Sequence, residues 1–204
     1  SMKSVNISQD KLRVQGFALV EVLVSVVVLA LGILALLATQ LRSVSSVREA
    51  ETQTIAAQAA QNLIEGMLSN PELELDNAGT WTKKKYGHYK SDDTKMPKNE
   101  PKYNEYTLNQ LAAWQLFNFS KELESGKLGD MGVKWRICED NDLSDKPEIM
   151  ADGTFDAKCS GSGNIAIKIA WLVDPNSSLV NPNSSGVQAE NQSVSYQTYL
   201  KDGQ

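Results

Sequence analysis

The stretch that decides the fold is residues 16–41, GFALVEVLVSVVVLALGILALLATQL. Of the 25 positions from 17 to 41, 20 are apolar. The exceptions are Glu21, Ser25, Gly32, Thr39 and Gln40. As a helix, the uncharged run between Glu21 and Arg42 rises about 30 Å, the thickness of a bilayer's hydrocarbon core. Because this block is apolar all round rather than along one stripe, it favours a membrane span over the buried helix of a soluble protein.

Charges on either side of the block indicate its orientation. The N-terminal flank carries Lys3, Lys11 and Arg13 against one acidic residue, Asp10. The positive-inside tendency therefore predicts a single-pass membrane protein with a cytoplasmic N-terminus and an exported C-terminal part. A cleaved secretory signal peptide is disfavoured, because its apolar core is shorter and ends in a small-x-small site.

Glu21 lies four positions inside the apolar block. A carboxylate in a membrane segment costs several kcal/mol and indicates a functional site with a cationic partner. The alternative is an interfacial glutamate whose side chain reaches the lipid headgroups.

The string from Gly16 to Val24, with its basic leader, resembles the type IV prepilin signature: a Gly, then Phe, then an apolar segment with Glu at its fifth position. Ala18 and Val20 replace the commoner Thr and Ile. The resemblance implies cleavage between Gly16 and Phe17 by a prepilin peptidase, followed by N-methylation of the new Phe17 amine. It also implies that Glu21 pairs with the Phe17 amine of a neighbouring subunit during assembly.

The expected organisation follows from this signature. Residues 1–16 form the leader, 17–42 the transmembrane and fibre-core half of a long helix, 43–70 its amphipathic half, and 71–204 an exported pilin domain. The helix should end near Ser69, because the residue before Pro71 disfavours the α region. The apolar stripe expected on its second half is Val44, Val47, Ile55, Ala59, Leu63 and Met67.

Helix and strand patterns continue through the exported part. Residues 107–124 read as a helix with the apolar face Leu108, Leu111, Ala112, Phe119 and Leu123. Alternating segments at 133–137, 165–173 and 194–200 predict antiparallel strands with one face covered by the long helix. The prediction is an α+β fold, the type IV pilin fold, in which a long N-terminal helix packs on an antiparallel β-sheet.

Residues 71–106 read as a polar connection in which lysines interleave with Trp81 and four tyrosines. A solvated surface loop is favoured over a nucleic-acid surface, because acidic residues dilute the charge and the chain is acidic overall, at −5. The four tyrosines are Tyr86, Tyr89, Tyr103 and Tyr106.

Cys138 and Cys159 are the two cysteines of the chain. If paired, they close a loop worth about 3 kcal/mol in the chain-entropy model, and an extracytoplasmic compartment permits the bond. Two free thiols are the alternative. The acidic stretches around Asp142 and Asp152 read as turns, since neither keeps the calcium-loop spacing. With His88 as the sole imidazole, we expect no zinc site, no cofactor and no catalytic residue.

The order of elements is similar to that of PilV-type minor pilins. This implies a structural subunit that helps initiate pilus assembly in a tip complex with other minor pilins, beside the major pilin. Its further partners would be the inner-membrane assembly machinery and, before assembly, membrane lipid. Twitching motility would depend on it.

The sequence is also compatible with other functions. A minor pseudopilin of a type II secretion system shares the first 70 residues' features. A membrane-anchored periplasmic enzyme or binding protein would use the apolar block only as an anchor, and a DNA-uptake pilin would act through Lys83, Lys84 and Lys85.

Overall fold

A computed structural model describes residues 8–142, 144–173 and 193–201. The chain divides into two units between Ser45 and Ser46. Residues 1–7 of the predicted leader, with Lys3, lie outside the described residues, as does residue 143 of the loop between the cysteines.

Helix α1, Ser8–Leu68, is the longest element, at 61 residues. Its end confirms the stop predicted next to Asn70-Pro71. Its start differs from the prediction of Phe17, because the helix runs through the leader side of Gly16. A single glycine destabilises a helix by only about 1 kcal/mol relative to alanine. This is not enough to end the helix where the neighbouring residues are good helix formers. In the first unit α1 is long and apolar enough to span a membrane.

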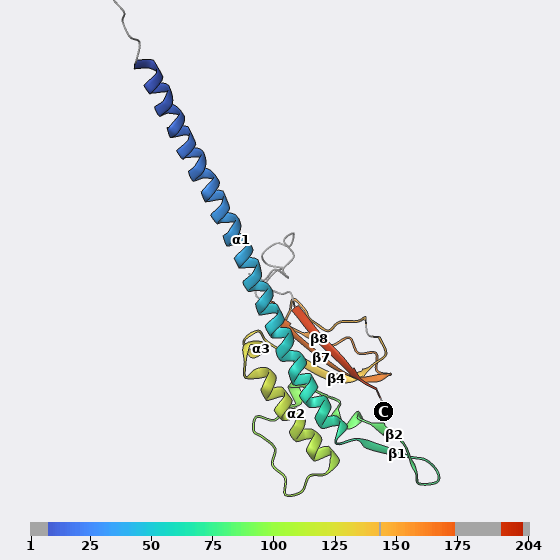
Figure 1. Cartoon of the computed structure of the whole chain (residues 1–204). Coiled ribbons are helices and arrows are strands. Elements are labelled where there is room, and N and C mark those ends of the chain that lie inside the picture. The colour runs from blue at the N-terminus through green and yellow to red at the C-terminus, as the bar shows by residue number, and fades with distance from the viewer. Residues whose placement is uncertain (1–7, 143, 174–192, 202–204) are drawn as a thin grey trace, which may run out of the picture. The chain divides into compact units, whose positions relative to one another are not determined.

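The second unit contains a four-stranded antiparallel sheet (Figure 1) in the order β3-β4-β7-β8. Its strands are β3 Ser91–Asp92, β4 Lys134–Asp140, β7 Asn164–Leu172 and β8 Ser193–Leu200. The three alternating segments found in the sequence are thus strands. In the register, Ile137 pairs with Ile167, and Ile169 pairs with Tyr196. The α+β fold of the type IV pilin kind is confirmed, with a long N-terminal helix packed on antiparallel strands.

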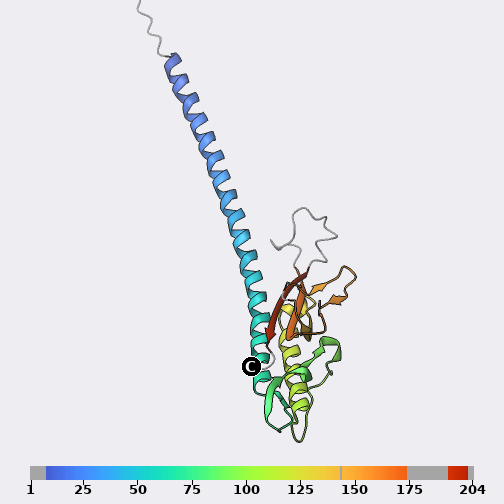
Figure 2. The same cartoon turned by 90° about the vertical axis from the view of Figure 1, so that its right-hand side faces the viewer.

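Two helices cover one face of this sheet. The second half of α1 lies beside α2, Leu108–Glu124, in both views (Figures 1 and 2), and Asn62 donates to Glu122 across them at 3.2 Å. Thr107 begins α2 with the predicted boundary and a capping box, in which its hydroxyl accepts from the Gln110 N–H. A short helix follows, α3, Lys127–Asp130.

Small side chains let α1 approach the rest of the core closely. Its buried apolar residues are Ala56, Ala59, Ala60, Leu63 and Met67. Opposite them, Trp135 is fully buried, meets the Phe119 ring edge-on at 5.1 Å and donates to the Ser120 hydroxyl. Two predicted core positions are wrong, because Val47 and Leu108 are exposed. Val44 has no described side chain.

The other face of the sheet is also covered, which corrects the prediction of a one-sided sheet. Ala166, Lys168 and Ala170 on that face of β7 are fully buried. The chain between the cysteines folds back over them and forms a hairpin of β5, Glu148–Ile149, and β6, Phe155–Asp156. The sequence pattern of β7 missed this, because alternation shows only that one face is more apolar than the other.

The predicted polar connection is more structured than expected. It contains a hairpin of β1, Glu72–Leu75, and β2, Trp81–Lys85, then the 3-10 helices η1, Gly87–Tyr89, and η2, Asp93–Lys95. Tyr86 and Tyr89 are fully buried core residues rather than parts of a solvated loop. They are therefore not available for stacking on nucleic-acid bases.

Gly129 provides a test of the packing between α2 and α3. A Cβ at this position would lie 1.9 Å from the backbone oxygen of Glu124. We expect Gly129→Ala to lower the free energy of unfolding by about 2 kcal/mol, since backbone must move to relieve the clash. Gly126→Ala, whose Cβ meets nothing within 4 Å, is the matched control and should change stability by less than about 0.5 kcal/mol. Denaturant unfolding measures both, and equal effects would contradict the packing described.

Candidate processing and assembly site

Gly16 and Phe17 lie inside α1, in a continuous turn of helix. Nothing lies within 4 Å of the Cβ position of Gly16, and the Phe17 side chain is 83% exposed. The Gly16–Phe17 peptide bond is thus sterically open, but its backbone groups belong to the helical hydrogen-bond ladder. Gly16 lowers the cost of unwinding this turn, because glycine is among the weakest helix formers.

Phe17 and Glu21 are four residues apart in the helix, and therefore lie on one face about 6 Å apart along the axis. Glu21 is exposed, and its backbone carbonyl accepts a hydrogen bond from the Ser25 hydroxyl at 2.7 Å. The carboxylate thus stands one turn beyond the atom that would become the mature N-terminus.

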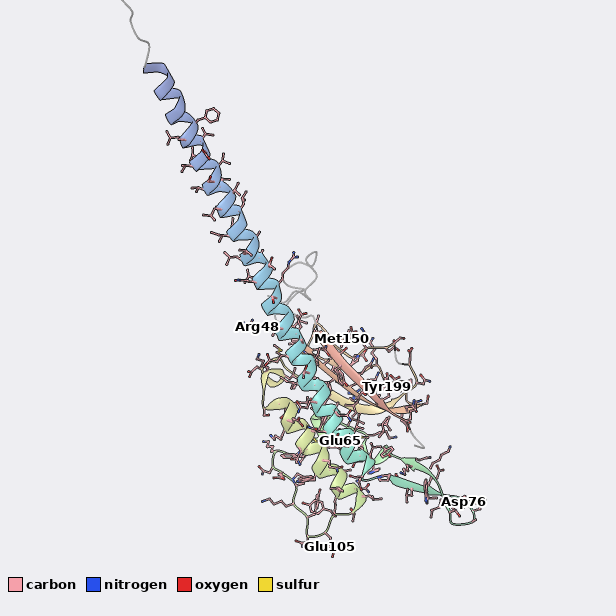
Figure 3. The ribbon with its side chains drawn as sticks, viewed as in Figure 1. Arg48, Glu65, Asp76, Glu105, Met150 and Tyr199 are labelled. Atoms are coloured by element: carbon pink, nitrogen blue, oxygen red, sulfur yellow. A yellow bond between two sulfur atoms is a disulfide. The ribbon has the colours of Figure 1, made fainter. Side chains whose placement is uncertain are left out.

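Apolar side chains project from this part of α1 (Figure 3), and the large ones from Phe17 to Leu41 are at least half exposed. The polar exceptions are satisfied locally, since the Thr39 hydroxyl donates to the Ala35 carbonyl at 3.0 Å as Ser25 does to Glu21. Such bonds leave no unsatisfied hydroxyl for an apolar environment to penalise. Glu21 is the exception, because its charge needs a partner from another molecule or from the interface.

The family model described as the prokaryotic N-terminal methylation motif matches residues 11–37, which include Gly16, Phe17 and Glu21. The N-terminal segment of this chain is therefore type IV prepilin-like. The motif implies processing by a prepilin peptidase and assembly with other pilins, and the apolar helix is consistent with membrane anchoring through the N-terminus. The comparisons found no similar curated protein and no similar solved structure.

In the second unit, Cys138 and Cys159 form a disulfide, as predicted, with their Cα atoms 6.2 Å apart. It joins β4 to the segment that leads into β7. The backbone of Gly161 donates to Glu139 next to it. Gly163 has a φ of +103°, and a Cβ there would meet the backbone oxygen of Asp140 at 2.7 Å, so a glycine is required where the chain turns into β7.

A buried ion pair lies beside the disulfide, and the sequence reasoning did not find it. The Lys168 ammonium is 2.6 Å from Asp140 Oδ2, and the two side chains are 0% and 1% exposed. The same ammonium donates to the backbone oxygens of Lys158 at 2.8 Å and Asp145 at 3.3 Å. All three of its protons therefore have acceptors, and they fasten the disulfide loop to the middle of β7.

Electrostatics around this pair favour the ionised form of Asp140. Burial disfavours the Asp140 carboxylate, but hydrogen bonds from Lys168 and from the backbone of Asp142 and Ser160 outweigh burial, so the pKa of Asp140 lies below its usual value. The Tyr199 hydroxyl lies 3.3 Å from the same carboxylate. Burial and the negative charge of Asp140 raise the pKa of Tyr199 to about 12. A lone lysine within the apolar run 165–171 was the signal that this side chain is held inside.

The acidic stretches form turns, as predicted. Asp142 accepts from the backbone N–H of Ser144, and Asp152 accepts in the same way from Thr154. The hydroxyls of Ser144 and Thr154 donate to the same carboxylates, and the hydroxyl and backbone hydrogen bonds together lower the pKa of both aspartates. Within residues 8–142, 144–173 and 193–201, no three His, Cys, Asp or Glu side chains gather closely enough to hold a metal ion.

The ion pair predicts a pH dependence of stability. Because the pKa of Asp140 is lowered in the folded state, its contribution is present above the unfolded value of about 4 and is lost as the pH falls through the folded value. We expect Asp140→Asn to cost about 3 kcal/mol at neutral pH, since it leaves the Lys168 ammonium buried without its counter-charge. Its unfolding free energy should also fall less steeply than that of the wild type below about pH 4.

Urea unfolding between about pH 7 and pH 3 checks this, with Asp145→Asn as the control. The Asp145 side chain is exposed and lies in the same loop, so its substitution removes the same charge without unpairing Lys168. If the free energy of unfolding fell equally steeply with decreasing pH in Asp140→Asn and in the wild type, the pair would not be ionised in the folded protein.

Processing predicts a specific mass for the native product. We expect intact-mass spectrometry of the chain from a host with a prepilin peptidase to show loss of residues 1–16 and gain of about one methyl group at Phe17. Gly16→Val should leave the leader attached. The valine side chain occupies the open space beside the scissile bond, and the resemblance implies that the peptidase requires glycine there. Ala18→Val, two positions on, is the control and should be processed normally.

Proposed function

We propose that this chain is a minor pilin of a type IV pilus. It would be a structural subunit that helps initiate assembly in a tip complex with other minor pilins, and so supports pilus biogenesis and twitching motility. The observation that carries the proposal is Glu21 one turn beyond Phe17, on a helix whose apolar side chains are exposed on every side. Such a helix needs other helices or lipid around it.

Glu21 and Phe17 supply a rule for adding subunits. After cleavage, the Phe17 amine is positive, and methylation keeps that charge. A neighbour shifted axially by about one helical turn brings its amine to this carboxylate, whereas other shifts leave a charge unpaired in low dielectric. Polar residues in apolar helical seams are best known for selecting register in this way.

The proposed orientation follows from the charges and the disulfide. Basic residues before the apolar block favour a cytoplasmic N-terminus. The Cys138–Cys159 bond fits an oxidising compartment, which favours a periplasmic C-terminal unit that later reaches the extracellular pilus tip. Membrane lipid would surround residues 17–42 before assembly, and other minor pilins and the major pilin afterwards. No catalytic role is proposed.

A minor pseudopilin of a type II secretion system is the nearest second candidate, because the methylation motif is common to both classes. The cysteine pair and the long C-terminal unit favour the pilus. In a third candidate, a membrane-anchored binding protein, the apolar helix would act only as an anchor, and Glu21 would be dispensable.

Complementation of a deletion strain tests the proposal. We expect Glu21→Val to be processed but to reduce surface pili and twitching by at least tenfold, because a buried amine without a counter-charge costs about 3 kcal/mol or more. Glu21→Asp keeps the charge and should retain part of the function. Ser25→Ala, on the same face one turn on, is the matched control and should retain nearly all of it.

Each other outcome identifies a different function. Loss of protein secretion with normal pili would replace the minor pilin by the pseudopilin. Full function of Glu21→Val in both assays would support a simple anchor and remove the proposed pairing with Phe17.

A further inference from the structure

His88, in η1, is a buried titratable side chain that the proposed function does not use. It is 6% exposed, and its Nε2 lies 2.8 Å from the backbone oxygen of Asn70, just beyond the end of α1. Its Nδ1 is buried and has no hydrogen-bond partner among the described residues. The Glu72 carboxylate, at the start of β1, lies close to it, with Oε2 at 3.9 Å from Nδ1.

The protonation pattern of this ring follows from its partners. A backbone carbonyl only accepts hydrogen bonds, so Nε2 must carry a hydrogen to bond with Asn70. A neutral imidazole has one N–H, so Nδ1 is then an acceptor only. The carboxylate of Glu72 is an acceptor too. Two acceptors that face each other form no hydrogen bond, which explains a separation of 3.9 Å rather than one near 2.8 Å.

We propose that His88 and Glu72 form a pH-operated latch on the β1–β2 hairpin. Protonation turns Nδ1 into a donor that faces the carboxylate, and a charge-assisted hydrogen bond then ties the first residue of β1 to η1. The Glu72 side chain is 60% exposed and can move toward the ring without displacing core side chains. While Nδ1 carries no proton the latch is open, because both groups are acceptors.

The surroundings leave Glu72 as the partner of Nδ1. On β2, Lys85 stands opposite Glu72 in the register, and its ammonium pairs with Glu74 at 3.0 Å. On η1, the Tyr89 ring contacts the imidazole at 4.6 Å between centroids, and burial raises the pKa of its phenol, which stays neutral. The nearby groups just beyond the end of α1 and on α2 in this network, Asn70 and Gln115, are uncharged. The carbonyl end of α1 favours a cation here.

The latch acts on a part of the fold that has little else to hold it. β1 and β2 pair only with each other in the described sheets, and a two-stranded hairpin alone is marginally stable in water. Figure 3 shows its turn, marked by Asp76, extending away from the four-stranded sheet. The hairpin carries Leu73, Leu75 and Trp81 on its surface, all about half exposed. Acid would thus order an apolar surface of the exported unit, whatever fibre the chain joins.

The first test needs no variant, because His88 is the sole histidine. The full chain, produced without a histidine tag, is labelled with ¹⁵N-histidine and studied in detergent micelles by NMR. We expect the neutral ring at about pH 8 to show a protonated Nε2 and a bare Nδ1, and the ring at about pH 5 to show both nitrogens protonated. A neutral ring protonated at Nδ1 would overturn the proposal.

The second test measures amide hydrogen exchange of Glu72–Leu75, corrected for the intrinsic effect of pH. In the wild type we expect roughly tenfold more protection at about pH 5 than at about pH 8, as for a hydrogen bond to a charged group. Glu72→Gln should remove this difference, because its amide nitrogen can donate to the bare Nδ1 at about pH 8 and its amide oxygen can accept from the protonated Nδ1 at about pH 5. Glu74→Gln removes the same charge from the same strand face and should retain the difference in protection between the two pH values. A difference that persists in Glu72→Gln, or is lost in both variants, would overturn the latch.

Discussion

The constraint on which the rest of the structure depends is that the apolar side chains from Phe17 to Leu41 have no core of their own to enter. A helix satisfies its backbone internally, so it is the form in which such a segment can exist in lipid or in a bundle of like helices. Ser25 and Thr39 obey the same constraint by bonding to carbonyls one turn back. The Glu21 carboxylate has no such partner within the helix. It therefore indicates a functional site, since a charge is tolerated there only with a cation from outside the helix.

The second half of the same helix meets a different requirement, and its side chains change accordingly. Ala56, Ala59 and Ala60 are fully buried and bring the backbone of α1 close to its neighbours. Gly66 also allows close packing, because a Cβ there would lie 2.9 Å from the amide of Gln115 on α2. A continuous helix thus serves two environments, with large residues where partners are lipid or other subunits and small ones where its own core packs against it.

Local patterns predicted the elements that local interactions determine. The end of α1 just before Asn70-Pro71, the helix expected over residues 107–124 and the alternating strands all follow from neighbouring residues, and all are confirmed. What failed depends on distant segments. Tyr86 and Tyr89 read as loop residues because nothing nearby in sequence shows that α2 and the end of α1 enclose them. For the candidate site, the motif fixed Gly16, Phe17 and Glu21 as candidates, but their pairing depends on a second molecule.

The loop between the cysteines is held by two different interactions, the Cys138–Cys159 disulfide and the ion pair between Lys168 and Asp140. The disulfide acts mainly by restricting the unfolded chain, and therefore does not choose among folded arrangements of the 20 residues that it encloses. The ion pair acts in the folded state. Its net contribution to stability is small compared with an apolar replacement, because both charges must be desolvated. Its three acceptors, however, sit on Asp140, Asp145 and Lys158, at both ends of the loop. An arrangement that misplaces any of them leaves a buried ammonium unsatisfied, so the pair selects the one path by which the loop covers β7.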